Sequence, residues 1–302
     1  MISGILLEPK RFAVHDGPGV RTTFFFKGCP LRCIWCHNPE AISPQAQMAC
    51  YAHKCINCGQ CVSVCKAGAQ RFDGGVHHFD VRKCRVCGDC EAGCLGAAMK
   101  LYGRQVSIEE AVAMALPDKS FYDESGGGVT LSGGEPLMQC DFAVGLLSEL
   151  KRNGIHTALD TCAFAPEAAI ARTLPFTDLY LVDFKHSDCE THRRLTGQPN
   201  GPILENLHFL SSHGARIEIR IPLVPGCNDS DVNMAGTGRF LSSLEGIDCV
   251  KLLPYHSLAR GKYAALGMED TMPAADSPAE AAIQHAASIL RGFGLNAHSG
   301  RE

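Results

Sequence analysis

Short apolar runs alternate with amphipathic stretches along most of the chain, which predicts strands followed by helices. Neighbouring parallel strands need a helical crossover between them, so this order predicts an α/β fold with a parallel sheet. The expected strands cover residues 22–27, 128–132, 155–160, 178–183, 216–222 and 248–253.

Helix signals occupy the segments between these strands. Ser107-Ile-Glu-Glu110 has the spacing of a capping box, in which the serine and the glutamate each satisfy a backbone N–H of the first turn. Asp141 is expected to cap the next helix, which should run to Asn153 and end at Gly154. Further helices are expected over residues 166–174, 205–213, 231–244 and 277–293.

The number of strand–helix units favours an open barrel. Six units are fewer than the eight of a closed barrel, so we expect a partial (β/α)6 barrel. Residues 48–101 are rich in Cys and Gly, show little helical periodicity and follow the first strand, which predicts an insert held together by metal. The expected domains are therefore the start of the barrel at 1–47, the insert at 48–101 and the rest of the barrel at 102–302.

Composition and charge exclude several classes of function. Hydrophobic residues make up 45% of the chain and charged residues 20%, as in ordinary globular proteins. The net charge is −4 without a block of like charges, so neither nucleic-acid nor membrane binding is expected. The first residues show no secretory pattern and no stretch reaches the ~18 apolar residues of a membrane helix. We expect a cytoplasmic protein, in which thiols stay reduced.

Cysteine is the unusual component, with 17 residues, of which eleven form three groups between Cys29 and Cys94. In a reducing compartment such groups favour metal binding over disulfides. Cys29, Cys33 and Cys36 form the first group, and three thiolates this close can hold three irons of a cubane cluster, leaving the fourth iron open to a substrate. The alternatives are zinc, with His37 as a fourth ligand, or buried free thiols.

The residues around this first group resemble a known family. Residues 14–29, Val-His-Asp-Gly-Pro-Gly-Val-Arg-Thr-Thr-Phe-Phe-Phe-Lys-Gly-Cys, and residues 36–40, Cys-His-Asn-Pro-Glu, resemble the N-terminus of the glycyl-radical-enzyme activating enzymes. These enzymes lie within the radical S-adenosylmethionine (radical SAM) superfamily, which is defined by the three-Cys spacing. The resemblance covers about residues 11 to 260 and departs from the family pattern at Ala163, where members often have Gly.

The resemblance implies a binding site for S-adenosylmethionine at the strand ends. In the family, the segment that contains Gly133, Gly134 and Glu135 holds the methionine amino group; glycine allows close backbone approach, and a carboxylate can accept bonds from an ammonium group. By the same resemblance, Lys185 contacts the methionine carboxylate, Arg220 the region around that carboxylate, His256 the ribose and Trp35 the adenine. Asp160, Thr161 and Asp183 can supply oxygens to a monovalent cation.

Each of these residues also has a simpler interpretation. A Gly-Gly-Glu segment can be a plain strand-to-helix turn, and an Asp and a Lys at strand ends can be an ion pair. A lone His or Trp can simply be buried. The resemblance, rather than any single residue, carries the assignment.

The remaining eight clustered cysteines form an internal repeat. Residues 55–65 match residues 84–94 in every Cys spacing, and both copies have the Cys-x2-Cys-x2-Cys-x3-Cys run of two-cluster bacterial ferredoxins. In that arrangement the fourth Cys of each run serves the other cluster. We therefore expect two 4Fe-4S clusters, although zinc is the alternative and Lys66 and Leu95 replace the usual Pro. The expected ligand sets are Cys55, Cys58, Cys61 and Cys94, and Cys84, Cys87, Cys90 and Cys65.

The expected activity follows from these sites and the resemblance. A reduced carrier such as flavodoxin or ferredoxin supplies electrons, S-adenosylmethionine is cleaved to a 5′-deoxyadenosyl radical, and the radical takes hydrogen from a glycine of a partner glycyl radical enzyme. Asp16, Gly17 and Gly19 are the candidates for contacting the partner, and an oxygen-sensitive protein of anaerobic metabolism is expected. Two alternatives stay open, namely a radical SAM enzyme acting on a small molecule or peptide, and a ferredoxin-like electron carrier. Cys50 has no assigned role.

Overall fold

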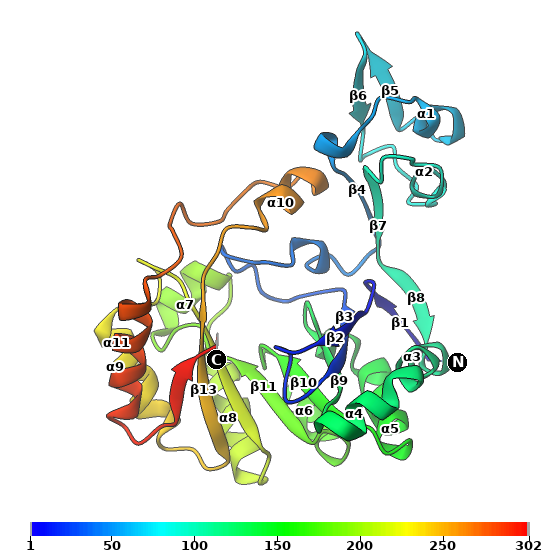
Figure 1. Cartoon of the computed structure of the whole chain (residues 1–302). Coiled ribbons are helices and arrows are strands. Elements are labelled where there is room, and N and C mark those ends of the chain that lie inside the picture. Colours follow the sequence, from blue (N-terminus) through cyan, green and yellow to red (C-terminus); the bar gives the residue numbers. More distant parts are fainter. Residues whose placement is uncertain (1, 301–302) are drawn as a thin grey trace.

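A ten-stranded mixed sheet organises the chain, whose computed structural model describes residues 2–300 (Figure 1). The strands follow the order β14-β13-β12-β11-β10-β9-β3-β1-β8, with β2 paired to β3. The parallel part contains β3 (Arg21–Phe26), β9 (Gly128–Gly133), β10 (His156–Thr161), β11 (Leu179–Asp183), β12 (Ile217–Leu223), β13 (Ile247–Pro254) and β14 (Ala297–Ser299). All six strands predicted from apolar runs are present, and they lie side by side in sequence order.

Antiparallel strands extend the sheet beyond β3 and were not predicted. β1 (Ser3–Leu6) pairs with both β3 and β8 (Arg104–Ser107), and β2 (Lys10–Ala13) pairs with β3. Each has only four residues, which is too short for an alternating pattern to stand out. The sheet is therefore mixed rather than wholly parallel.

The helices largely follow the predicted pattern. They are α3 (Ile108–Ala115), α4 (Lys119–Ser125), α5 (Cys140–Arg152), α6 (Glu167–Thr173), α7 (Cys189–Thr196), α8 (Gly201–Ser212), α9 (Asp231–Leu241), α10 (Arg260–Leu266) and α11 (Glu280–Arg291). The capping box before α3 is confirmed, because Glu110 N donates to Ser107 Oγ (3.2 Å) and Ser107 N donates to Glu110 Oε2 (2.7 Å). The helices α4, α7 and α10 were not predicted.

Two helix starts differ from the prediction. Gln139, rather than Asp141, occupies the N-cap of α5, and the Asp141 carboxylate instead accepts a hydrogen bond from Arg172 Nη2 (2.7 Å). α8 begins at Gly201, four residues before the expected start, with a proline in its first turn, where the missing N–H costs nothing.

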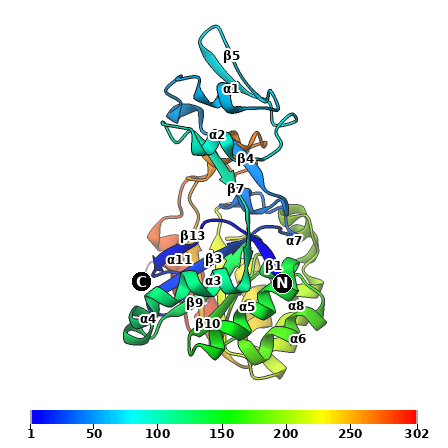
Figure 2. The ribbon, with the colours of Figure 1, turned by 90° about the vertical axis from the view of Figure 1, so that its right-hand side faces the viewer.

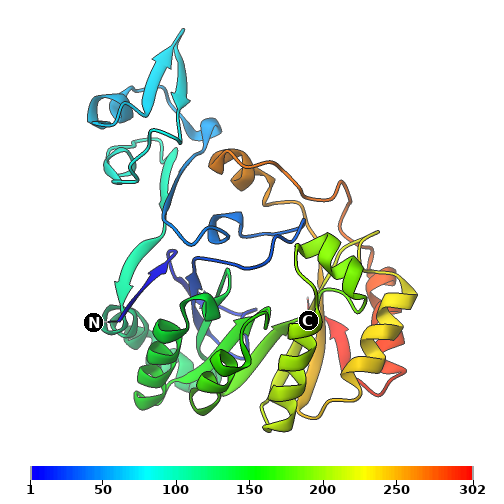
Figure 3. The ribbon, with the colours of Figure 1, turned by 180° about the vertical axis from the view of Figure 1, so that it is seen from behind.

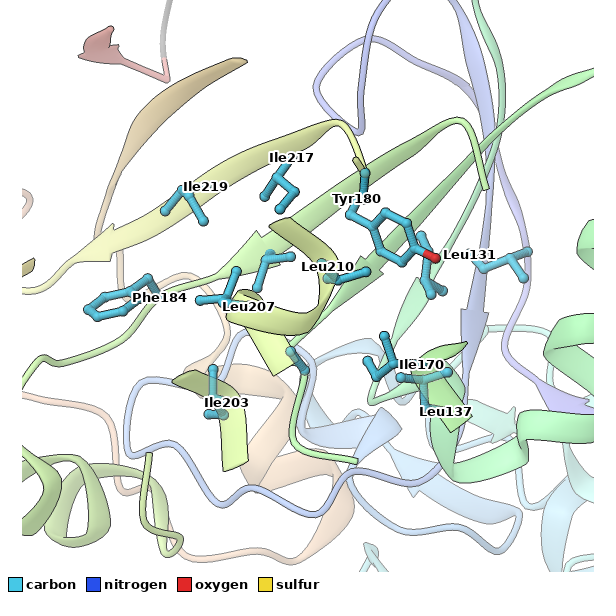
Figure 4. Packing of buried hydrophobic residues seen from close by; sticks show 14 of the residues in the cluster. Leu131, Leu137, Ile170, Tyr180, Phe184, Ile203, Leu207, Leu210, Ile217 and Ile219 are labelled. Atoms are coloured by element: carbon cyan, nitrogen blue, oxygen red, sulfur yellow. The ribbon is translucent and has the colours of Figure 1, made fainter. Parts of the chain in front are cut away.

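Apolar packing holds the helices against the sheet. Figure 3 shows α5, α6, α8, α9 and α11 on one side of the sheet. In Figure 4, Leu207 and Leu210 of α8 lie close to strand residues such as Ile217 and Ile219, and all four are fully buried. Burial of apolar surface stabilises by roughly 25 cal/mol per Å², so this layer fixes the strands. Fixed strands give fixed positions to the side chains at their carboxyl ends.

Residues 47–102 project away from the sheet (Figures 1 and 2). Two antiparallel strands, β4 (Gln47–Cys50) and β7 (Met99–Tyr102), form the stem of this projection. Beyond the stem lie α1 (Gln60–Val64), the hairpin of β5 (Gln70–Asp73) and β6 (Val76–Phe79), and α2 (Asp89–Ala92). Ala49 of the stem packs against Ala265 and Leu266 of α10, which ties the projection to the rest of the chain.

No helix within residues 2–300 combines the length and the apolar character needed to cross a lipid bilayer.

Candidate active site

A cavity of about 390 Å³ lies at the carboxyl ends of the parallel strands. These ends share one edge of the sheet, so residues far apart in sequence meet there. The cavity brings together most of the residues expected to bind cofactor. Those that line it are Asp16, Cys29, Cys33, Trp35, Cys36, Gly133, Gly134, Asp160, Thr161, Asp183, Lys185, Arg220 and His256. Its size falls within the ~300–1,000 Å³ range of cofactor pockets.

The three cysteines of the first group lie on the loop that follows β3. Neighbouring segments hold this loop through its backbone: Arg32 N donates to Thr196 O (2.6 Å) and Ile34 N to Leu195 O (3.0 Å), both at the end of α7. From the other side, Tyr263 of α10 donates its hydroxyl to Cys36 O (3.0 Å). Two of the unpredicted helices, α7 and α10, therefore fix the positions of the cysteines.

The thiols of this loop are strongly desolvated. Burial raises the pKa of Cys33 to about 12 and that of Cys36 to about 11. The pKa of Cys29 is instead lowered, chiefly by a hydrogen bond from the Cys162 thiol, whose own pKa that contact raises. Metal ligation requires thiolates, so binding a metal centre here would release protons.

Gly133 allows the close approach of β9 to β3, and Gly134 allows the close approach of the next residue to the start of the cysteine loop. A Cβ on Gly134 would lie 2.2 Å from Gly28 O, and one on Gly133 would lie 2.3 Å from Phe26 N. Gly133 also has φ +114°, a conformation that L residues rarely adopt. Both positions therefore exclude a side chain.

Glu135 does not line the cavity, in contrast to its two glycine neighbours. It is fully buried, and its carboxylate accepts bonds from Thr161 Oγ (2.8 Å), Cys162 N (2.8 Å) and Leu137 N (3.1 Å). Burial raises its pKa, and these hydrogen bonds oppose that shift. In this structure the carboxylate joins the end of β9 to the end of β10.

Four charged side chains face one another across the cavity. Lys185 Nζ donates to Asp183 Oδ2 (2.7 Å), while Arg220 Nη1 lies 3.8 Å from Asp160 Oδ2. Burial raises the pKa of Asp160 to about 7, even though Arg220 and a bond from Ser132 Oγ (2.6 Å) favour its charged form. Two cations and two carboxylates in one cavity suit a ligand that carries charges of both signs.

Aromatic rings line another part of the cavity. His37 stacks on His256, with ring centroids 4.1 Å apart and an interplanar angle of 17°. His37 Nε2 is buried without a hydrogen-bond partner among residues 2–300, which is costly unless a ligand supplies one. Trp35 is only 4% exposed and packs with Leu195 and Tyr255 while still lining the cavity. The stacking of His37 on His256 was not predicted, because the two residues are 219 positions apart in the sequence.

Of the residues expected to contact a partner, only Asp16 reaches the cavity. Its carboxylate accepts a bond from Thr23 Oγ (2.7 Å). Gly17 and Gly19 both have positive φ and serve the turn; a Cβ on Gly19 would lie 2.5 Å from Gly127 N. Arg21, fully buried, supports this turn by donating to Pro18 O (3.1 Å).

Two smaller cavities in the projecting region gather the other eight clustered cysteines. One is lined by Cys55, Cys58, Cys61 and Cys94, and the other by Cys65, Cys84, Cys87 and Cys90. Each cavity thus contains three cysteines of one run and the last cysteine of the other, as the spacing predicts. Among residues 2–300, no three His, Cys, Asp or Glu side chains meet at the close spacing of a single-ion site.

The two Cys runs repeat in backbone conformation as well as in sequence. Three pairs of equivalent residues have positive φ, and the non-glycine members Asn57, Val86 and Ala97 adopt it against their intrinsic preference. Equivalent amides also donate to the last cysteine of each run, Ala69 N to Cys65 Sγ (3.3 Å) and Ala98 N to Cys94 Sγ (3.2 Å). The equivalent pairs are Asn57 and Val86, Gly59 and Gly88, and Gly68 and Ala97.

Comparison with known proteins identifies the family. The model of the radical SAM superfamily matches residues 23–236, more than half of the chain. The chain belongs to the radical SAM superfamily. It is 40% identical over 298 residues to the choline trimethylamine-lyase activating enzyme of Oleidesulfovibrio alaskensis, covering 96% of this chain and 95% of that protein. It is 42% identical over 272 residues to the (2S)-3-sulfopropanediol dehydratase activating enzyme of Klebsiella oxytoca, covering 88% and 86%.

Within the radical SAM superfamily, the chain therefore belongs with the activating enzymes of glycyl radical enzymes. Membership implies S-adenosylmethionine and a 4Fe-4S cluster as cofactors. The crystal structure of Streptococcus suis SuiB bound to precursor peptide SuiA shares the fold of this radical SAM protein, with a TM-score of 0.51 and 14% identity over 65% of this chain and 42% of that chain. The prediction of a radical SAM activating enzyme is confirmed.

Proposed function

We propose that this enzyme cleaves S-adenosylmethionine at the strand-end cavity and uses the product radical to take a hydrogen atom from a glycine of a partner glycyl radical enzyme. The observation that carries the proposal is the meeting of Cys29, Cys33 and Cys36 with the Asp183–Lys185 pair in one cavity. Relatives that match along most of the chain are activating enzymes, which supports a protein substrate.

The first group of cysteines fits a 4Fe-4S cluster with one open iron. When bound, such a cluster supplies the electron that splits the cofactor into methionine and the 5′-deoxyadenosyl radical. The chain contributes three thiolates on a loop held from both sides. The Nε2 of His37, which is buried and has no hydrogen-bond partner within the described part of the chain, is a further polar atom that a ligand in this cavity could satisfy.

The charged residues of the cavity fit the methionine end of S-adenosylmethionine. Lys185 and Arg220 can accept its carboxylate, and Asp160 and Asp183 can accept bonds from its ammonium group. We assign Glu135 a supporting role, since its carboxylate holds Thr161 and the Cys162 amide in place. His256 and Trp35 are proposed to contact the ribose and the adenine.

A monovalent cation is proposed beside the methionine carboxylate. Asp160, Thr161 and Asp183 bring hard oxygens to the same part of the cavity, and such oxygens suit alkali cations. The cation would lower the repulsion between the two carboxylates, which otherwise raises the pKa of Asp160 further.

The projecting region is proposed to be a ferredoxin-like insert, residues 48–101, that holds two further 4Fe-4S clusters. The two four-cysteine cavities and the repeated backbone support this assignment. The chain around the insert, 1–47 and 102–302, is proposed to form a partial (β/α)6 barrel, since the six strands expected from the sequence lie side by side and parallel in sequence order. A flavodoxin or ferredoxin is the proposed electron donor, and Asp16 with the Gly17–Gly19 turn is the proposed contact for the partner's glycine loop.

The test of the proposed function is product formation by the anaerobically reconstituted full chain with S-adenosylmethionine and a strong reductant. We expect 5′-deoxyadenosine, and a glycyl radical signal by electron paramagnetic resonance (EPR) once a glycyl radical enzyme encoded beside this chain is added. Cys33→Ala should abolish both, whereas Cys140→Ala, outside the three cavities, should abolish neither. An iron-loaded sample that forms no 5′-deoxyadenosine would overturn the proposal. Cleavage without a glycyl radical on any such partner would redirect it to a small molecule or peptide substrate.

A further inference from the structure

The two cysteine cavities of the insert are linked by a continuous chain of polar side chains. At its centre, His77 Nε2 lies 2.7 Å from Gln70 Oε1. His77 Nε2 is also 3.4 Å from Cys61 Sγ in one cavity, and Gln70 Nε2 is 3.7 Å from Cys90 Sγ in the other. His77 and Gln70 lie on β6 and β5, the two strands of the hairpin.

The geometry assigns the hydrogen atoms of this chain. Gln70 is only 4% exposed, so both ends of its amide need partners. With its N–H₂ toward Cys90, the amide donates to a ligand thiolate, and its carbonyl accepts from His77 Nε2–H; the opposite orientation would point a carbonyl oxygen at a thiolate. The imidazole hydrogen is therefore on Nε2, and this N–H is shared between two acceptors, Gln70 Oε1 and Cys61 Sγ.

Cys50 completes the chain on the far side of the imidazole. Its Sγ lies 3.6 Å from His77 Nδ1, the nitrogen that carries no proton in this tautomer. The Cys50 thiol can therefore donate to Nδ1 and fix the ring orientation. Phe72 supports the same ring, with centroids 5.3 Å apart. This gives Cys50, which belongs to neither ligand set, a positioning role.

We propose that His77 and Gln70 set the difference in reduction potential between the two insert clusters, by directing one donor to a ligand thiolate of each. This inference rests on the proposed presence of both clusters. Reduction adds negative charge to a cluster, so a donor to a ligand sulfur stabilises the reduced form and raises the potential. Because Gln70 draws the shared Nε2–H away from Cys61 while donating to Cys90, it acts on the two clusters in opposite directions.

The experiment is an EPR-monitored redox titration of the anaerobic, iron-loaded full chain. In Gln70→Leu, the donor to Cys90 is lost and the His77 N–H donates only to Cys61. The reduction potential of one cluster should therefore fall, and that of the other should rise. In His77→Leu, the reduction potential that rose in Gln70→Leu should fall, and the reduction potential of the other cluster should stay unchanged. His77→Gln keeps a donor and should lie closer to the unsubstituted protein than His77→Leu does.

A matched control lies one position along the same strand. His78 is exposed, so His78→Leu makes the same chemical change without touching the polar chain and should change neither reduction potential. Unchanged reduction potentials in both Gln70→Leu and His77→Leu would overturn the inference. A fall of both potentials in Gln70→Leu would also overturn it, because altered solvation or packing acts on both clusters in one direction.

Iron analysis separates failure of this inference from failure of the proposed function. Three clusters require about twelve irons per chain. If the protein binds only the iron of one cluster, the insert clusters are absent and the proposed function of the insert is contradicted. A fully loaded protein without the opposite shifts would overturn only the role of His77 and Gln70.

Discussion

Lys185 Nζ lies 2.7 Å from Asp183 Oδ2 at the carboxyl end of β11, with the lysine side chain only 6% exposed. Both residues line the strand-end cavity. Burial opposes the charged form of Lys185, but the neighbouring Asp183 carboxylate raises the pKa of Lys185, so the ammonium is charged. A buried cation beside a cavity is well placed to receive a carboxylate.

Lys185→Met should therefore weaken the binding of S-adenosylmethionine. Loss of a charge-assisted hydrogen bond costs about 1.5–3 kcal/mol, which corresponds to roughly 10- to 100-fold in the dissociation constant. Anaerobic equilibrium dialysis of the reconstituted protein measures it. Lys151→Met is the control, because Lys151 forms a surface ion pair with Asp178 away from the cavity. Equal affinities of the two variants would contradict the role of Lys185.

Glu135→Gln should lower the stability of the protein more than its affinity for S-adenosylmethionine. The amide would turn an N–H₂ toward a group that now donates to the carboxylate, leaving buried donors unpaired. The expected loss is about 1–3 kcal/mol in the free energy of unfolding, measured by urea denaturation. Glu149→Gln on the exposed side of α5 is the control. Unchanged stability with lost cofactor binding would instead place the carboxylate at the methionine amino group.

Gly134→Ala should disturb the cysteine loop. The added Cβ would lie 2.2 Å from Gly28 O, a backbone atom that can move only with the loop. We expect a loss of about 1–3 kcal/mol in stability, together with reduced iron at the first group of cysteines. Thermal unfolding and iron analysis measure the two effects. Gly201→Ala, with no atom within 4 Å of the added Cβ, should change neither, and a similar loss there would remove the argument from close approach.

Asp118 should make the protein sensitive to acid. Its buried carboxylate accepts bonds from Arg11 Nε (2.7 Å) and Thr22 Oγ (3.2 Å), and the bond from Arg11 lowers its pKa below the ordinary 3.8. The unfolded chain therefore binds the proton more tightly, so this stabilisation is present above about pH 3.8 and is lost as the pH falls further.

Urea denaturation at a series of pH values tests this prediction. Asp118→Asn should be less stable at neutral pH and should lose less stability on acidification. Asp123→Asn, which removes only a surface ion pair with Lys119, should keep the pH dependence of the free energy of unfolding of the original protein. If Asp118→Asn also keeps this pH dependence, the acid sensitivity comes from other carboxylates.

The proposed insert clusters should matter for electron delivery by a protein donor. Cys58→Ala and Cys87→Ala each remove one cysteine from one insert cavity. If the clusters relay electrons, both variants should lose 5′-deoxyadenosine formation with reduced flavodoxin and keep it with a small-molecule reductant. If both variants keep full turnover with flavodoxin, the insert does not relay electrons, and docking of partner proteins is the role that stays open.

The sequence was sufficient for six of the seven parallel strands because each contains a short apolar stretch between helical segments, and the carboxyl ends of parallel strands meet at one edge whatever the details of the loops. Cys29, Lys185 and Arg220 could thus be placed in one cavity without a structure. The short strands β1, β2, β8 and β14 could not be predicted, because three or four residues carry no measurable period. The helix α7 was missed because its sequence, Cys-Glu-Thr-His-Arg-Arg-Leu-Thr, is mostly polar.

Contacts between distant segments also escaped prediction. The position of Glu135 depends on how tightly β9 approaches the cysteine loop, which local sequence does not encode. The stacking of His37 on His256 depends on α10, which holds the loop through Lys262 and Tyr263. Cysteine spacing predicted which cysteines gather at each cavity of the projecting region, but it contained no sign of the link through His77 and Gln70.

The exchange of fourth cysteines between the two runs also has a consequence for biosynthesis. The cavity of the first run lacks Cys94 until the ribosome has made the second run, and the second cavity takes Cys65 from a segment made earlier. Neither cavity is therefore complete on a nascent chain that ends before Cys90, and the first cavity still lacks Cys94 at that point. If both proposed clusters are present, the cellular machinery that delivers iron and sulfide would meet no finished site in this region until almost the whole insert had been made, and the two sites would then be completed four residues apart.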